Sequence, residues 1–333
     1  MRQHTMQFAN FILRFGEKKF LLDYLDTVVI PAITSKKIVR RYGRKTKFKL
    51  VDTNIVRLES GDKPVFGVYG RLVKDTLLVR TQLLIEGDTL VKDESSMRSS
   101  PSSFFLLVIN NHRLVYFPET PHAPDLKAFK ATIQYFLDEE HRRYIRKLIS
   151  TPIGAPFPRS VSEAYFENPA PTLEVVPLGG GKDLVEFLRQ YKVLKKISLR
   201  VVRPNPELDG AEILGELVEY TKKLEADSST LISESKGGLS VDAAIETAKD
   251  AIETGSVFVT TNGTDKLGNQ LQGNNEKFII TRNLAAIPPD DSGTAAKMYD
   301  ALKKLGDEQI VKVPSISLSK VNADFLEAQS LSE

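Results

Sequence analysis

The sequence predicts an α+β fold of two mixed domains, the first strand-rich and closed by a long helix, the second alternating strands and helices. The chain has 333 residues, which is enough for about two domains. Prolines at 152, 156, 158, 169 and 171 mark a linker. Apolar residues follow mainly the strand period before residue 120, and both periods after residue 172. We therefore expect domains at 1–150 and 173–333, joined by a Pro-rich linker at 151–172.

Most elements of the first domain follow from residue alternation and turn composition. Lys45 to Leu50 alternates charged with apolar or neutral residues, which is typical of a strand with one wet face. Pro31 is expected to end the preceding helix. The expected elements are a strand at 6–15, a helix at 20–30, strands at 45–50, 65–73 and 76–84 with a turn at 74–75, a mobile loop at 95–103, and strands at 104–109 and 113–117.

A long helix should close the first domain, because Leu126, Phe129, Ile133 and Phe136 follow helical spacing directly after Asp125. The second domain contains one well-marked helix, with Ser240 as its N-cap and Gly255 beyond its end. The other elements expected there are strands at 173–177, 195–202, 257–260 and 278–281, helices at 182–191, 213–224 and from 294 to a stop at 306, and a polar loop at 262–275.

The composition removes several classes of chemistry. There is no cysteine, so disulfides, thiolate metal sites and cysteine nucleophiles are excluded. The four histidines are not spaced as metal ligands, and no nucleotide-binding or hydrolase motif occurs. We expect no cofactor, and the sequence points away from an enzyme. A metal-dependent nuclease stays open only through carboxylates such as Asp23, Asp26 and those at 138–140.

Charge is divided unevenly along the chain. The formal net charge is only +3, yet the first 200 residues carry +12 and the remaining 133 carry −9. A division of this kind indicates one end that faces a polyanion.

The strongest functional signal is a basic tract without a single acidic residue. Its cations are Lys36, Lys37, Arg40, Arg41, Arg44, Lys45, Lys47 and Lys49. On a strand, alternate residues of this tract would point to one side and could follow a phosphate backbone. Two other readings stay open: a solvated loop, or a surface that docks on the acidic half of the chain.

Weaker signals lie elsewhere in the chain. At the end of the long helix, Arg142 and Arg143 can pair at i,i+4 spacing with carboxylates, which leaves Arg146 and Lys147 as candidate phosphate contacts. The cations at 195, 196, 200 and 203 are expected on an ordinary solvated strand edge. The glycines at 179–181 indicate a flexible turn between strand and helix, because the chain around them does not match a phosphate-binding loop. The amides at 262–275 could enter a groove, although a hairpin tip is favoured.

No apolar run reaches the length of a membrane span or a signal-peptide core. The expected location is the cytoplasm, with no membrane partner.

A resemblance covers about a fifth of the chain, between residues 195 and 259. A strand ends in Arg203-Pro204-Asn205-Pro206, a long acidic helix follows, and Gly238-Leu239-Ser240-Val241-Asp242 leads into an Ala-rich helix and a strand. This order resembles uncharacterised proteins encoded in bacterial anti-phage defence regions, and more distantly the phage-exclusion and Kiwa-type DNA-binding proteins. The resemblance implies double-stranded DNA binding without chemistry, as a homodimer and beside a protein partner.

The sequence therefore predicts a non-enzymatic DNA-binding protein that contacts mainly the phosphate backbone. RNA stays open, since phosphate contacts alone do not separate the two. The alternative is a protein-interaction scaffold or a homo-oligomeric structural component, and a metal-dependent nuclease comes third.

Overall fold

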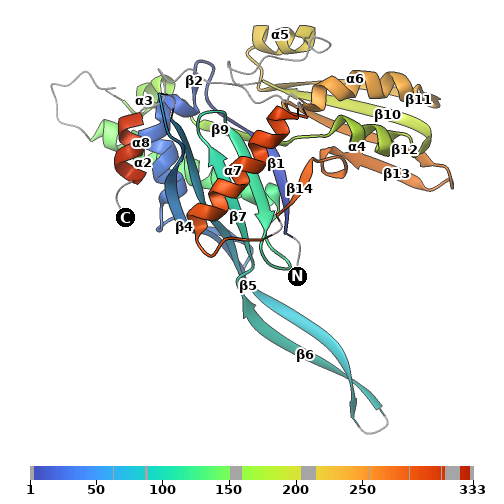
Figure 1. Cartoon of the computed structure of the whole chain (residues 1–333), viewed down its shortest axis with the longest axis horizontal. Helices are drawn as coiled ribbons and strands as arrows, with labels where there is room; N and C mark the ends of the chain where they lie inside the picture. Colours follow the sequence, from blue (N-terminus) through green and yellow to red (C-terminus); the bar gives the residue numbers. More distant parts are fainter. Residues whose placement is uncertain are drawn as a thin grey trace.

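The computed structural model describes residues 4–62, 64–86, 89–150, 160–203, 215–253, 255–284, 286–308, 310–311 and 323–330. The fold is α+β, as predicted, and its strands form two sheets (Figure 1). A long two-stranded ribbon projects from the body (Figure 1).

The larger sheet has ten strands. Its main path runs β14 (Thr281–Leu284), β1 (His4–Phe15), β8 (Arg113–Pro118), β7 (Ser102–Val108), β5 (Val65–Glu86), β4 (Thr46–Glu59) and β3 (Arg40–Tyr42). The short β2 (Lys19–Phe20) and β9 (Pro171–Pro177) also pair with β1, and β6 (Thr89–Ser99) pairs with β5. The strands predicted at 6–15, 45–50, 104–109 and 113–117 are all present.

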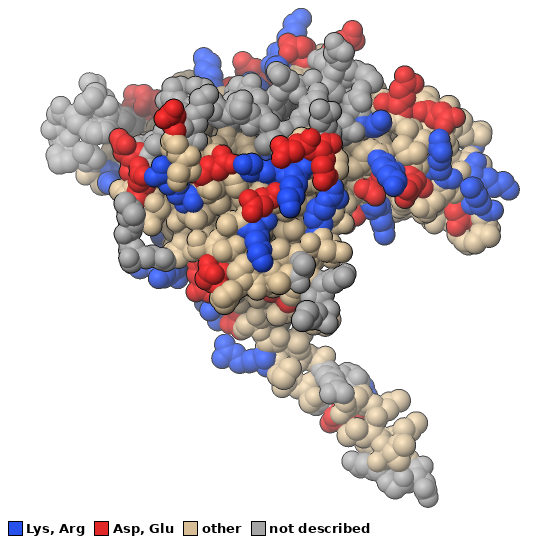
Figure 2. Space-filling view, in the orientation of Figure 1, with Lys and Arg blue, Asp and Glu red and all other residues tan. Residues whose placement is uncertain are grey.

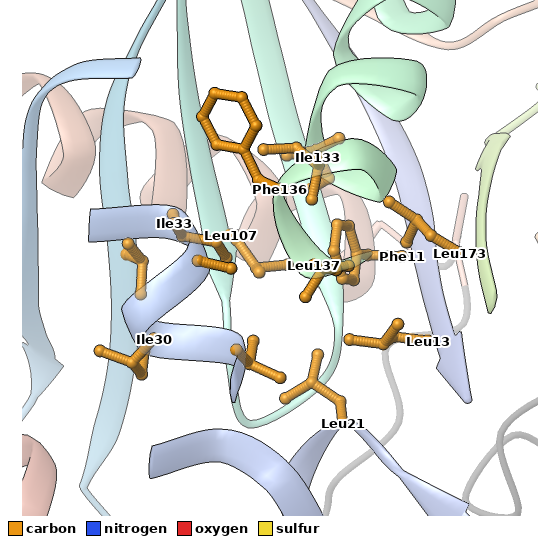
Figure 3. Close-up of a cluster of buried hydrophobic side chains, with 14 of the residues drawn as sticks. Phe11, Leu13, Leu21, Ile30, Ile33, Leu107, Ile133, Phe136, Leu137 and Leu173 are labelled. Atoms are coloured by element: carbon orange, nitrogen blue, oxygen red, sulfur yellow. The ribbon is translucent and has the colours of Figure 1, made fainter. Parts of the chain in front are cut away.

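Alternation along β7 supplies two cores, one on each face of this sheet. Phe105 and Leu107 face helix α2 (Leu126–Ile149), and Phe104 and Leu106 face helix α7 (Asp291–Asp307). The α2 side includes Ile133, Phe136 and Leu137, packed against side chains of β1 and of the segment that follows it (Figure 3). Both faces of the sheet are therefore apolar, which explains the strongly hydrophobic strands.

Helix α2 starts where the sequence predicts a cap. The Asp125 carboxylate accepts a hydrogen bond of 2.7 Å from the Ala128 amide and opens α2.

Among the described residues, no helix is both long and apolar enough to cross a bilayer.

The helix expected at 20–30 is wrong in its end point. The chain forms a 3-10 turn (Leu21–Tyr24), a π-helical turn (Leu25–Val29) and the short α1 (Ile30–Thr34). Pro31 lies in the first turn of α1, directly after the π-helical turn, so the helical run continues through it instead of ending.

The hairpin expected at residues 65–84 is also wrong, because β5 runs unbroken from Val65 to Glu86. Lys74 and Asp75 continue the strand instead of turning. Two partners hold β5 on the same side in succession: β7 pairs with it up to Val73, and β6 pairs with it from Thr76. The mobile loop expected at 95–103 is likewise replaced by β6 and the start of β7.

The smaller sheet has the order β11 (Ser228–Leu239), β10 (Tyr191–Val202), β12 (Val257–Asp265) and β13 (Gln270–Asn274). Helices α4 (Gly181–Leu188) and α6 (Val241–Glu253) pack on one face through Leu184, Ala248 and Ile252. The polar loop expected at 262–275 is wrong in extent. Strands β12 and β13 occupy most of it and leave a short turn, in which Gly268 has φ +88°.

The predicted boundary at 151–172 does not separate the two sheets. β9 and β14 lie beyond it and pair with β1, and α7 covers the larger sheet. Residues 151–159 lie outside the described part of the chain. The remaining helices are α3 (Val161–Glu167), α5 (Gly215–Lys223) and α8 (Ala323–Ser330).

Candidate nucleic-acid interface

The basic tract forms a hairpin at the edge of the larger sheet. β3 pairs with the start of β4, with Arg41 opposite Lys47 and Tyr42 opposite Thr46. Gly43 opens the turn between them with φ +61°, a conformation that costs glycine little. Ile38 is buried and anchors the approach to the hairpin. We call residues 36–49 the basic hairpin.

Strand alternation exposes the cations of β4. Phe48 and Leu50 are buried against the α2 core, so Lys47 and Lys49 point to the other face and are exposed. Arg41 lies opposite Lys47 and therefore joins them on that face. Two strand rises separate Lys47 from Lys49, about 7 Å. The predicted strand pattern thus produces the row of cations that it implied.

Seven of the eight cations of the basic hairpin are exposed. They are Lys36, Lys37, Arg41, Arg44, Lys45, Lys47 and Lys49. In the described part of the chain, none of the seven forms an ion pair with a carboxylate. Their mutual repulsion is therefore offset by solvent ions or by a bound polyanion.

Arg40 has a different environment from the other seven. Its Nη1 donates a hydrogen bond of 3.2 Å to Oγ1 of Thr132 in α2. Its guanidinium carbon lies 5.7 Å from the ring centroid of Tyr42 and 5.4 Å from that of Phe48. Arg40 is half-buried and connects the basic hairpin to α2. It therefore holds the hairpin in place and is not one of its exposed cations.

The structure does not bring Arg146 and Lys147 to the basic hairpin. Both are exposed in the last turn of α2. Arg146 follows Thr132, the Arg40 partner, by about 21 Å along the helix axis. Lys147 lines a separate cavity with Asp26 and Tyr144. The ten predicted residues therefore divide into one exposed surface, one anchor and a distant pair.

The other basic groups are largely engaged in ion pairs. Arg142 pairs with Glu139, and Arg143 with Glu140 at 2.5 Å. These pairs have i,i+3 spacing, where the sequence predicted i,i+4. In the smaller sheet, three ion pairs join Lys196 to Glu234 at 2.5 Å, Arg200 to Glu174 at 3.3 Å, and Arg203 to Glu17.

Ion pairs also test whether the basic tract docks on the acidic half of the chain. Several cations of the first 200 residues form ion pairs with carboxylates of the acidic half. Arg14 pairs with Asp227 at 2.6 Å, Arg57 with Glu327 at 2.5 Å, and Lys127 with Glu276 at 2.8 Å. None of these cations belongs to the basic hairpin. The charge division is thus partly neutralised within the fold, but not at residues 36–49.

The histidines have structural surroundings. Burial, and next the charge of Arg113, lowers the pKa of His112 to about 4. His141 is buried beside the Asn168 carbonyl oxygen, 3.0 Å from its Nε2, and burial lowers its pKa. Across the described ranges, no three His, Asp or Glu side chains gather in a way that could hold a metal ion.

Two arrangements of side chains could not be predicted from the sequence. Arg71, inside β5, donates to Asp291 at 2.6 Å through both terminal nitrogens and to Glu119 at 3.0 Å, and these contacts raise its pKa. Asp291 begins α7, so Arg71 fixes this helix on the sheet. Only the packing of α7 on the sheet brings Arg71 and Asp291 together, because 220 positions separate them in the chain.

The other missed feature is the open face of the smaller sheet. Strand pairing places Asn262 between Lys196 and Gln272, and Thr260 beside Asn274. These side chains line a shallow cavity of ≈ 520 Å³. The amides expected in a loop are thus presented by strands, on the face that α4 and α6 leave uncovered.

No protein-family model matches the chain, and a comparison with curated proteins finds no match. The resemblance of residues 195–259 to anti-phage defence proteins therefore stays a prediction.

Proposed function

We propose that this chain is a non-enzymatic protein that binds double-stranded DNA through phosphate contacts of the basic hairpin. One observation carries the proposal: seven exposed cations on one hairpin, without carboxylate partners in the described structure. Lys and Arg side chains of this kind dominate the affinity of proteins for duplexes.

The surroundings of the cations favour a duplex over a single strand. Proteins that bind single strands stack successive bases on several aromatic side chains. On the basic hairpin, Tyr42 is the exposed aromatic residue, at 65% exposure, while Phe48 is buried. A duplex RNA presents phosphates as well, so it is included in the test.

The experiment titrates a DNA duplex, a single strand and an RNA duplex at several salt concentrations. If about four of the seven cations contact phosphates, log Kd should rise with log salt with a slope near 3.6. A slope near zero for every nucleic acid would contradict the proposal.

Charge reversal locates the surface. Arg41→Glu, Lys47→Glu and Lys49→Glu together should weaken binding to all duplex sequences about equally, since phosphates carry no sequence information. The matched control reverses three exposed lysines in or next to strands of the smaller sheet: Lys192→Glu, Lys195→Glu and Lys266→Glu. Both triple variants have the same net charge. If they weaken duplex binding equally, the effect depends on overall charge, and the basic hairpin is not the binding site.

The second candidate function is protein interaction, favoured by the apolar ribbon described below. It is compatible with DNA binding and includes the predicted homodimer and a protein partner. A cytoplasmic place in anti-phage defence rests on the resemblance of residues 195–259. The nuclease alternative has no carboxylate cluster among the described residues to support it.

A further inference from the structure

The projecting ribbon has a free strand edge. We call residues 76–86 of β5 and 89–99 of β6 the arm. β4 pairs with β5 only up to Asp75, so the edge of β5 from Leu77 outward has no strand partner among the described residues (Figure 1). Isolated two-stranded ribbons are marginally stable in water, and unpaired edges readily accept another strand.

The arm is also unusually apolar for a solvent-exposed segment. The most exposed apolar side chains are Val79 at 59%, Leu83 at 64%, Ile85 at 77%, Leu90 at 66% and Met97 at 65%. Uncharged residues cover most of the arm in Figure 2. Residues 76–99 contain three basic and four acidic residues, so the arm does not suit a phosphate backbone. Exposed apolar surface of this extent marks a protein interface.

The sequence of the β5 edge is nearly symmetric about Thr81. Residues 77–79 are Leu, Leu and Val, and residues 83–85 are Leu, Leu and Ile. If two β5 edges pair antiparallel around Thr81, every apolar residue stands opposite another. The pairs are Leu77 with Ile85, Leu78 with Leu84, Val79 with Leu83, and Arg80 with Gln82. A twofold interface requires self-complementarity of this kind.

The β6 edge lacks this symmetry. An equivalent pairing centred on β6 would place Glu94 opposite its own copy and Leu90 opposite Arg98. Like charges directly opposite each other destabilise a strand pair. The self-complementary edge is therefore that of β5.

The free edge of β5 begins directly beyond its pairing with β4. Thr46 at the start of β4 contacts Thr76, with 2.8 Å between their hydroxyl oxygens, so the free edge begins at Leu77.

We infer that this chain forms a twofold homodimer in which the β5 edges of two arms pair antiparallel, centred on Thr81. The paired segment is residues 77–85, about 31 Å long. The product is a four-stranded ribbon with β6 of each copy outside. This inference rests on the arm and not on the proposed DNA binding, and its test contains no nucleic acid.

The first test uses the absence of cysteine in the natural chain. In the proposed dimer the two Thr81 Cα atoms are about 4.5–5.5 Å apart, which is within disulfide range. Thr81→Cys should therefore cross-link rapidly into a covalent dimer under mild oxidation. The matched control is Ser96→Cys, on exposed β6 opposite Val79. Its two copies would be three strand spacings apart across the ribbon and four residues apart along it, about 20 Å in all, and should cross-link slowly.

The second test uses charge across the dyad, with the mass in solution measured by light scattering. Val79→Glu with Leu83→Glu sets two carboxylates against each other and should give monomers. Val79→Glu with Leu83→Lys sets opposite charges against each other and should restore the dimer. Both positions are exposed, so folding should be retained. A monomeric natural chain, equal cross-linking at 81 and 96, or a dimer that tolerates the two acidic substitutions would overturn the inference.

Discussion

Arg40 and Arg41 are neighbours in the chain but face opposite sides of the larger sheet. Arg40 points toward α2, where it meets the Thr132 hydroxyl and two aromatic rings. Arg41 is exposed on the face of Lys47. The side-chain period of two thus gives adjacent arginines different roles.

This difference predicts separate effects of two substitutions. Arg40→Ala should lower the free energy of unfolding by about 1–2 kcal/mol, because it removes a hydrogen bond and cation–π contacts. Arg41→Ala should leave urea unfolding unchanged and reduce the salt slope of DNA binding by about 1. The two variants serve as controls for each other. Equal effects of both on stability would contradict these roles.

His112 predicts a pH dependence of stability. Its folded pKa of about 4 lies below the ordinary value of 6.5, because burial and Arg113 disfavour the charged ring. The unfolded chain therefore binds more protons between these values, and stability falls as the pH falls from 6.5 toward 4. His112 should account for a loss of up to about 3 kcal/mol in the free energy of unfolding.

Urea unfolding at several pH values measures this loss. His112→Asn should flatten the dependence in that window, since Asn tolerates the positive φ of 54° at this position. A variant with the full dependence of the natural chain would assign the effect to other groups, His141 among them.

At the scale of elements, β5 shows how strand partners override a local turn signal. Lys74 and Asp75 separate two apolar runs, a pattern that predicts a turn. In the fold, β4 and β7 hold the strand on both sides up to this point and β6 continues beyond it. No residue of the arm belongs to the described hydrophobic cores, so the arm is an appendage of the sheet.

Removal of the arm should therefore leave the body folded. Replacing residues 77–98 with Asn-Gly joins Thr76 to Ser99, which already pair, by a favoured two-residue hairpin turn. The free energy of unfolding should stay within about 1 kcal/mol of the natural value, because no core contact is lost. The homodimer should be lost. A body that fails to fold, or a truncated chain that still dimerises, would contradict the independence of the arm.

At the scale of the whole molecule, the charge division of the chain has two parts. Some of the basic half is neutralised internally, as in the pairs of Arg14 with Asp227 and Arg71 with Asp291. The basic hairpin takes no part in these pairs and keeps its charge at the surface. Net charge along the sequence indicates the basic half of the chain, and tertiary contacts separate its exposed cations from the neutralised ones.

The elements that could be predicted depend on local patterns. β1, β7, β8, α2 and the capped start of α6 follow from periodicity and caps, which act over a few residues. The helix at 20–30, the turn at 74–75 and the loops at 95–103 and 262–275 were wrong in extent. Strand pairing replaced the turn and the two loops, while the helix at 20–30 continues through Pro31 into α1.

The α+β class, the long capped helix and the basic tract with its strand alternation follow from residues close in the chain. Long-range packing makes Arg40 an anchor, keeps Arg146 and Lys147 remote, and brings β9 and β14 into the first sheet. It also decided that β5 continues into an arm with a free edge. These features depend on which distant strands pair, and pairing is selected by burial of whole sheet faces rather than by any local pattern.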